Sequence, residues 1–128
     1  MQLIKVSKEV NFTYPKESKY TYCVPEGLTI SQEKMYSIAG ISGSGKSTIL
    51  TLLAGLRRFN QGAITYHWSS SEDKPIMVNA ENWSKKVGPH FWRNIGFSFQ
   101  KPELLRALPV GMNLKLALGE NYEEMELI

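Results

Sequence analysis

Apolar and polar residues alternate along the first part of the chain. Residues 3–14 carry apolar side chains among polar ones, and a polar break at 15–19 separates them from a second apolar run at 20–24. This alternation is typical of strands with one buried face, so it predicts a hairpin or meander at the start of the chain. Short apolar runs predict further strands at 36–39, 63–68, 76–78 and 95–99.

A helical spacing replaces the alternation after residue 48. Apolar side chains recur at i, i+3, i+4 and i+7, at Ile49, Leu52, Leu53 and Leu56. We expect Arg57 and Arg58 in the last turn of this helix, where cations complement the helix dipole, and 60–62 to end it. Weaker helical patterns cover 81–86, 110–118 and the acidic stretch 120–128.

Length and composition indicate one modest globular domain. The chain has 128 residues, of which 42% are hydrophobic, and a net charge of +3. Its basic residues come in short pairs rather than in one stripe, which favours a solvated surface over nucleic-acid binding. The single cysteine, Cys23, excludes an internal disulfide and is expected to be a small buried hydrophobe.

Neither a signal peptide nor a membrane span is visible, because no apolar run approaches the roughly 18 residues that a span needs. We therefore expect a soluble, cytoplasmic chain whose membrane association would come through a partner. His67 and His90 lack partners at metal-ligand spacing and are interpreted as structural. Phe91 and Trp92 are interpreted as packing residues, with contact to a partner as the alternative.

The stretch 40–48, GISGSGKST, carries the clearest chemistry. Residues 40–47 satisfy G-x-x-x-x-G-K-[ST], with a predicted strand before the loop and a helix after it. Glycines let such a loop present its N–H groups to phosphate oxygens, and the helix N-terminus adds its own. A Gly/Ser-rich linker is the alternative, but a linker would lack the flanking strand and amphipathic helix. The expected nucleotide-binding residues of this loop are Gly40, Ser42, Gly43, Ser44, Gly45, Lys46, Ser47 and Thr48.

Each side chain at the end of the loop has a distinct expected role. The Lys46 ammonium would reach the β- and γ-phosphates, and the Ser47 hydroxyl would bind Mg²⁺. Thr48, one residue on, would reach the α-phosphate. The loop therefore predicts a nucleoside triphosphate and Mg²⁺ as ligands, but it does not by itself separate kinases, GTPases, motors and transporter ATPases. ATP as the nucleotide is what the family resemblance described next implies.

Three motifs in order resemble the nucleotide-binding subunit of ATP-binding cassette (ABC) transporters. The loop S-G-S-G-K-S-T is followed by ILTLLAGL and then by Gly62, as in that family. Upstream, residues 11–15 (NFTYP) resemble its adenine-stacking segment, and downstream, 95–105 (IGFSFQKPELL) is similar to its Q-loop. LPVGMNL at 108–114 echoes the segment that follows, with Gly111 and Met112 in place of the usual residues.

The resemblance implies a fold and a domain division. The fold would be α/β, an incomplete RecA-like P-loop NTPase core with an N-terminal antiparallel β portion. Within 1–128, the antiparallel β portion would cover 1–35, the P-loop core 36–100 and the start of the helical subdomain 101–128.

The resemblance also assigns two further site residues and the partners. Tyr14 would stack on adenine, the alternative being a partly exposed strand tyrosine. Gln100 would contact Mg²⁺ and the attacking water, the alternative being a strand-end side chain that caps nearby backbone. The partners would be a membrane-embedded permease and a second nucleotide-binding subunit, and no nucleic acid is expected.

Three motifs of the family are missing from residues 1–128: the signature L-S-G-G-Q, an apolar strand ending in Asp-Glu, and a switch His. Hydrolysis needs a residue that positions the water and further metal support, so we expect this chain alone to bind ATP without hydrolysing it. It is either a fragment of a longer subunit or a truncated product, and without further core strands we do not expect it to fold stably alone.

Other functions remain open on the residues alone. A non-transport ABC ATPase of DNA repair or translation would share these motifs. A small P-loop kinase would need an arginine-bearing lid and an acceptor pocket, neither of which can be assigned. The third alternative is a non-catalytic remnant that binds nothing.

Overall fold

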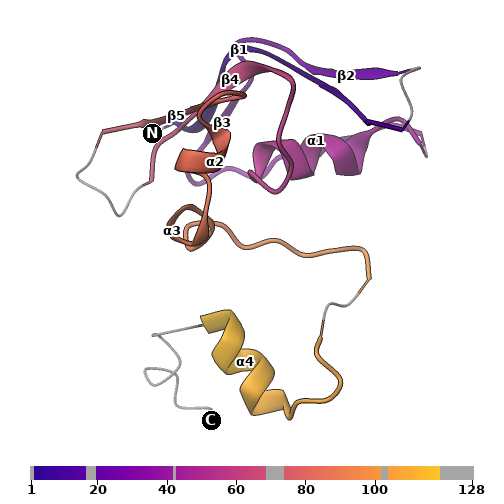
Figure 1. Ribbon diagram of the computed structural model, residues 1–128, viewed down its shortest axis with the longest axis vertical. Helices are drawn as coiled ribbons and strands as arrows, with labels where there is room; N and C mark the ends of the chain where they lie inside the picture. The colour runs from indigo at the N-terminus through magenta and orange to yellow at the C-terminus, as the bar shows by residue number, and fades with distance from the viewer. Residues whose placement is uncertain (1, 17–19, 42, 69–73, 102–103, 119–128) are drawn as a thin grey trace. The chain divides into compact units, whose positions relative to one another are not determined.

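The structure is a computed structural model that describes residues 2–16, 20–41, 43–68, 74–101 and 104–118 (Figure 1). The chain divides into two compact units, Met1–Gly96 and Phe97–Ile128, which are described separately below. The division of the chain at residues 35 and 100 that the sequence suggests stays a prediction.

An antiparallel sheet forms the first unit, with the long strand β1 (Gln2–Thr13) at its centre. The strands that accompany it are β2 (Thr21–Val24), β3 (Thr29–Ser31), β4 (Gln61–Tyr66) and β5 (Ile76–Asn79). The order is β2-β1-β4-β5, and β3 also pairs with β1. The predicted N-terminal antiparallel β portion is confirmed, and β4 and β5 extend the same sheet with strands from after the glycine loop.

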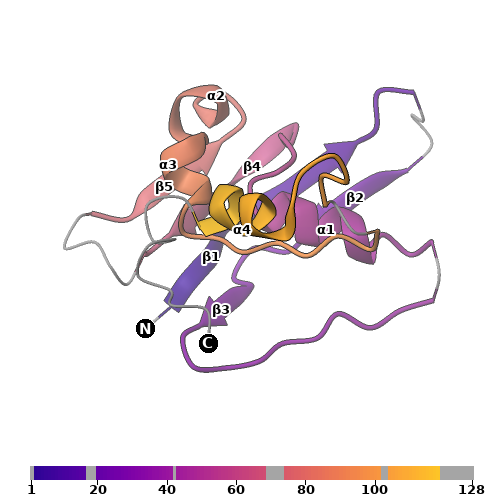
Figure 2. The same ribbon diagram turned by 90° about the horizontal axis from the view of Figure 1, so that it is seen from below.

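The core lies between this sheet and helix α1 (Lys46–Leu53), which runs along one face of the sheet (Figure 2). Alternate residues of β1 point to this face. The buried core residues of the two sheet strands and the helix are Val6, Val10, Phe12, Ile64, Tyr66, Leu52 and Leu53. Each large apolar side chain buried here contributes roughly 1.5–3 kcal/mol to folding. The packing therefore fixes α1, and with it the glycine loop, on the sheet.

Helix α1 ends earlier than the sequence pattern predicts. Ala54 is its C-cap, and Gly55 follows in the left-handed conformation at φ 69° that commonly terminates helices. The expectations that Arg57 and Arg58 occupy its last turn, and that 60–62 ends it, are therefore wrong. Arg58 instead donates hydrogen bonds from Nε and Nη2 to the Ala80 carbonyl oxygen at 3.0 and 2.6 Å.

Two predicted strands are absent from the described residues. Neither 36–39 nor 95–99 pairs with another strand, although both are described throughout. A short apolar run indicates only that a segment can be extended and buried, whereas a strand also needs a neighbour's N–H and C=O groups. Tyr36 and Ile38 consequently keep 47% and 38% of their surface exposed.

Two short helices follow β5. The predicted helical turn is confirmed as α2 (Trp83–Lys86), and α3 (Pro89–Trp92) begins with the proline that suits a first helical position. Phe91 is buried, with its ring centroid 4.7 Å from that of Tyr66, and Trp92 donates from Nε1 to the Gly55 carbonyl oxygen at 3.1 Å. The interpretation as a packing residue is confirmed for Phe91, whereas Trp92 keeps 39% of its surface exposed, and its contact with a partner stays a prediction.

The second unit contains the predicted helix α4 (Val110–Leu118). Asn113 links it to the preceding turn, because its side chain accepts from the Leu105 N–H at 2.9 Å and donates to the Leu105 carbonyl oxygen at 3.1 Å. The helix predicted over 120–128 lies outside the described residues. In the part of the chain that is described, every helix is too short or too polar to cross a bilayer.

Gly62 provides a test of the sheet. Its φ is 106°, and a Cβ there would lie 2.3 Å from the Glu9 carbonyl oxygen, so neighbouring backbone leaves no room for a side chain. We expect Gly62→Ala to lower the free energy of unfolding by about 3 kcal/mol or more in urea denaturation. Gly27→Ala is the matched control, because Gly27 also has positive φ, at 89°, but open space around it. It should cost only about 1–2 kcal/mol, and equal losses would contradict the backbone contact.

Tyr66 makes stability depend on pH. It is 1% exposed, and burial raises its pKa well above the ordinary value of 10.0. Below pH 10 the phenol is neutral in both states, whereas above pH 10 the unfolded chain loses this proton and the folded chain retains it. The free energy of unfolding should therefore fall as the pH rises above 10. The fall should be steeper in the wild type than in Tyr66→Phe, by up to about 1.4 kcal/mol per pH unit.

The matched control for this titration is Tyr20→Phe, because Tyr20 is 70% exposed. Urea denaturation from pH 9 to 11 should give Tyr20→Phe the wild-type slope. A Tyr66→Phe slope equal to that of the wild type would show that Tyr66 does not control the loss.

Candidate functional site

The glycine loop turns directly into the N-terminus of α1. Gly43 and Gly45 have φ of 79° and 96°, a left-handed conformation that side chains rarely adopt, and Gly45 is the N-cap residue. The Ser44 N–H donates to the Ile41 carbonyl oxygen at 3.2 Å, which closes a turn before the helix. Ser42 lies outside the described residues. The predicted junction of loop and helix is therefore present, with its unpaired N–H groups at the start of α1.

Gly45 also brings an aromatic ring against the loop. A Cβ at this position would lie 2.4 Å from Cε1 of Tyr22, a residue of β2. Only the absence of a side chain lets the Tyr22 ring pack onto the loop backbone at this point. The sheet thus contacts the loop as well as the helix.

Lys46 directs its ammonium group back to the loop. Its Nζ donates to the Gly40 carbonyl oxygen and, at 3.1 Å, to the Ile41 carbonyl oxygen. Ser47, the next residue, is exposed, and no hydrogen bond of its hydroxyl is found among the described residues. The predicted cation and hydroxyl therefore both lie at the first turn of α1.

Thr48 connects the loop to the predicted adenine-binding residue. It is 8% exposed, and its Oγ1 lies 2.7 Å from Oη of Tyr14, a hydrogen bond in which either oxygen can be the donor. Tyr14 follows directly after β1 and is half-buried. The structure thus brings together two residues that the sequence assigned to different parts of the nucleotide, Tyr14 to the base and Thr48 to the α-phosphate.

Aromatic and cationic neighbours surround the Tyr14 ring. The Phe12 and Tyr22 rings meet it at near-perpendicular angles, with centroids 4.8 and 5.8 Å away. The guanidinium carbon of Arg57 lies 4.8 Å from the Tyr14 centroid. Sequence reasoning assigned Arg57 only to a helix end, because no local pattern relates it to a residue of the sheet so far away in the chain.

Gln100 belongs to the second unit, where it is exposed. Its predicted contact with Mg²⁺ would involve the loop of the first unit, and the two units are described separately. The role of Gln100 therefore stays a prediction.

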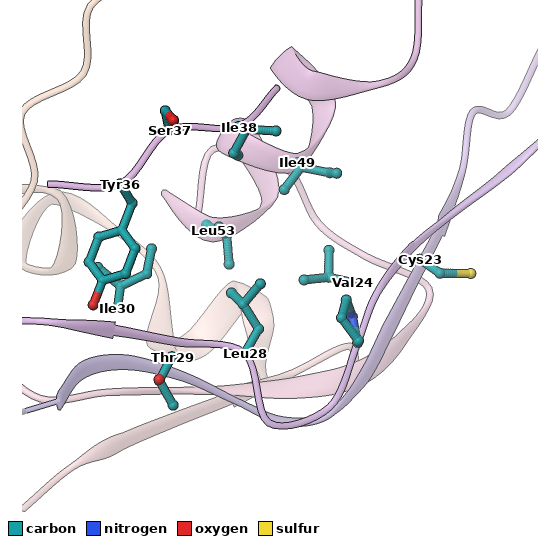
Figure 3. Close-up of a pocket in the computed structure, with 11 residues that line it drawn as sticks. Cys23, Val24, Leu28, Thr29, Ile30, Tyr36, Ser37, Ile38, Ile49 and Leu53 are labelled. Carbon is teal, nitrogen blue, oxygen red and sulfur yellow. The ribbon is translucent and has the colours of Figure 1, made fainter. Parts of the chain in front are cut away.

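An apolar pocket of about 200 Å³ lies between α1 and the segments 23–30 and 36–38 (Figure 3). Ile49 and Leu53 of the helix and Leu28, Ile30 and Ile38 contribute to its walls, and none of the predicted site residues lines it. Cys23 borders the pocket with its sulfur directed away from the apolar side chains (Figure 3). Cys23 is exposed, so the expectation of a small buried hydrophobe is wrong: its position on β2 faces away from the core, unlike its neighbour Val24.

Metal-binding clusters of protein side chains are not found in the described part of the chain. Nowhere among those residues do three or more His, Cys, Asp or Glu side chains lie close enough to hold an ion.

Comparison with known proteins gives a consistent set of relatives. Residues 26–127 match the family model described as ABC transporter. The chain is 30% identical over 115 residues to the ABC transporter ATP-binding protein YxdL of Bacillus subtilis, a match that covers 87% of this chain and 40% of that protein. It is 31% identical over 116 residues to the molybdenum import ATP-binding protein ModC of Pseudomonas syringae pv. tomato, covering 88% and 28% of the two chains.

A third relative is the sulfate/thiosulfate import ATP-binding protein CysA of Mesorhizobium japonicum, which is 33% identical over 91 residues, covering 71% of this chain and 22% of that protein. The chain thus spans less than half the length of these curated relatives. No solved structure matches it significantly.

The hydrogen bond between Tyr14 and Thr48 can be measured by a double-mutant cycle. Tyr14→Phe and Thr48→Val each remove one partner, and we expect a coupling of about 1 kcal/mol in the free energy of unfolding. The control is the exposed pair Thr13 and Thr21, whose Oγ1 atoms lie 3.0 Å apart. The cycle of Thr13→Val and Thr21→Val should give a coupling below about 0.5 kcal/mol, because water replaces exposed partners. A coupling between Tyr14 and Thr48 that is no larger than this value would contradict their hydrogen bond.

Proposed function

The chain belongs to the ABC transporter family of ATP-binding proteins, and we propose that residues 1–128 supply the part that binds MgATP. The observation that carries the proposal is the phosphate loop. Gly43 and Gly45 hold left-handed backbone at the start of α1, and Lys46 and Ser47 follow in its first turn. This arrangement gathers backbone N–H groups, the positive end of a helix and a cation, which together match the charge of a triphosphate.

The phosphates and the metal would be bound by neighbouring side chains. Lys46 would pair with the β- and γ-phosphates, and Ser47 would bind Mg²⁺ through its exposed hydroxyl. When bound, the Mg²⁺ would neutralise phosphate charge and take most of its remaining ligands from phosphate and water oxygens. Gln100 is proposed as a further Mg²⁺ contact that also orients the attacking water.

The base would bind at Tyr14. Its ring lies at the end of β1, tied to α1 through Thr48, and a tyrosine ring offers a stacking surface for adenine. Thr48 is proposed to reach the α-phosphate with a hydroxyl whose present partner is the Tyr14 hydroxyl. The stacking surface and the phosphate loop are therefore joined by one hydrogen bond.

For the whole protein, we propose ATP-driven transport. Two of the relatives are named as import ATP-binding proteins, one for molybdenum and one for sulfate and thiosulfate. By this likeness the chain would act with a membrane-embedded permease and a second nucleotide-binding subunit, at the cytoplasmic side of the membrane. Residues 1–35 would then form the antiparallel β portion, 36–100 part of a RecA-like core, and 101–128 the start of a helical subdomain.

Hydrolysis is not proposed for residues 1–128 alone, because the signature sequence, the strand ending in Asp-Glu and the switch His are not among them. The family assignment leaves the small P-loop kinase without support. No observation favours a role in DNA repair or translation, or a remnant that binds nothing.

Removal of the loop cation tests the proposal. We expect Lys46→Ala to weaken MgATP binding by about 100-fold, because a charged partner of the phosphates is lost. Isothermal titration calorimetry of the chain with MgATP gives the dissociation constant directly. Lys34→Ala is the matched control, since Lys34 is an exposed lysine shortly before the loop and should leave the affinity unchanged.

Both variants should keep the far-UV circular dichroism of the wild type. Equal MgATP affinity of Lys46→Ala and the wild type would exclude this loop as the phosphate site. No measurable binding by a folded wild-type chain would overturn the proposed function itself.

A further inference from the structure

Arg57 lies outside the recognised motifs but contacts the ring of the proposed base site. Its guanidinium carbon is 4.8 Å from the Tyr14 ring centroid and 5.3 Å from that of Phe12. We infer that Arg57 is a positioning residue for purine recognition, holding the Tyr14 ring in the orientation in which it stacks on the base. This inference rests on the proposed function, in which Tyr14 binds adenine.

The contacts found for Arg57 among the described residues are with two aromatic rings. Its Nε is buried and has no hydrogen-bond partner among the described residues. Burial of a guanidinium N–H without such a partner is unfavourable unless another interaction offsets it. A cation over the faces of two aromatic rings is such an interaction, and it contributes about 0.5–2 kcal/mol depending on desolvation. Arg58 differs, because both of its described hydrogen bonds go to the Ala80 carbonyl oxygen.

Tyr14 is held at three points by different elements. Thr48 of α1 fixes its hydroxyl, Phe12 of β1 meets its ring at 79°, and Arg57, which follows α1, lies over the ring. A ring that is fixed in this way loses little further conformational freedom when a base stacks on it. Arg57 would therefore increase affinity for the base without touching the phosphates.

The class of ligand follows from the separate binding surfaces for the base and for the phosphates. A ligand with a purine and a triphosphate would use both the ring and the loop, whereas a bare triphosphate would use the loop alone. Loss of Arg57 should consequently change the ratio of the two affinities. If Arg57 had a purely structural role, its loss would weaken the affinities for both ligands.

The test compares MgATP with magnesium tripolyphosphate by calorimetry on the 128-residue chain. We expect Arg57→Met to weaken MgATP binding about fivefold and to leave tripolyphosphate binding unchanged. Arg57→Lys keeps a cation at this position and should restore most of the MgATP affinity. Arg58→Met, the same change at the adjacent residue, should leave the ratio of the two affinities at its wild-type value.

Three results would overturn the inference while leaving the proposed function intact: wild-type MgATP affinity in Arg57→Met, equal weakening of both ligands, or the same shift in Arg58→Met. If Arg57→Met is not folded by circular dichroism, Arg57→Gln replaces it and is judged by the same ratio. A wild-type chain that binds neither ligand would instead refute the proposed function, and this inference with it.

Discussion

The packing of α1 on the antiparallel sheet is the interaction on which the candidate site depends. Leu52 and Leu53 are buried among side chains of β1 and β4, which fixes both the axis and the rotation of the helix. Because Lys46, Ser47 and Thr48 occupy its first turn, their directions follow from that rotation. A shift of α1 by part of a turn would separate Thr48 from Tyr14 and move the loop away from Tyr22.

The sheet contributes more to the site than a surface for the helix. Its strands β1 and β2 bring Tyr14 and Tyr22 together at the loop–helix junction, where Tyr14 is bound to Thr48 and Tyr22 packs against Gly45. Strand β1 pairs with three other strands, so the position of Tyr14 at its end is determined by a network of backbone hydrogen bonds. The aromatic residue proposed to bind the base thus follows β1, whereas the residues proposed to bind the phosphates belong to the loop and α1. The hydrogen bond between Tyr14 and Thr48 connects the two.

Local pattern predicted the elements whose structure is decided locally. Alternation located β1 and β2, short apolar runs located β4 and β5, and the glycine motif located the start of α1, because side-chain period and backbone preference act within a few residues. The end of α1 was missed because Gly55 stops the helix within an apolar pattern that continues to Leu56. The strands predicted at 36–39 and 95–99 failed because pairing depends on a neighbour, which the segment's own residues do not encode.

In the candidate site, too, features encoded by neighbouring residues could be predicted, and features that depend on distant residues could not. The residues of the loop could be predicted, since one contiguous motif carries its chemistry. The contacts of Tyr14 with Thr48 and Arg57 could not, because they join residues that only the tertiary fold brings together. Cys23 was misplaced for a related reason: its strand was recognised, but which face of that strand is buried is decided by the register of β2 against β1.

The two carbonyl contacts of Lys46 have a consequence for selectivity. Because its ammonium already has the Gly40 and Ile41 oxygens as partners, an anion gains only the difference between its own attraction and theirs. Two neutral carbonyls compete poorly with several adjacent phosphate charges but appreciably with a single, well-hydrated anion. The loop would therefore discriminate by the total charge of the ligand. A polyphosphate would displace the two carbonyl partners of Lys46, whereas chloride or a single inorganic phosphate would gain little by displacing them.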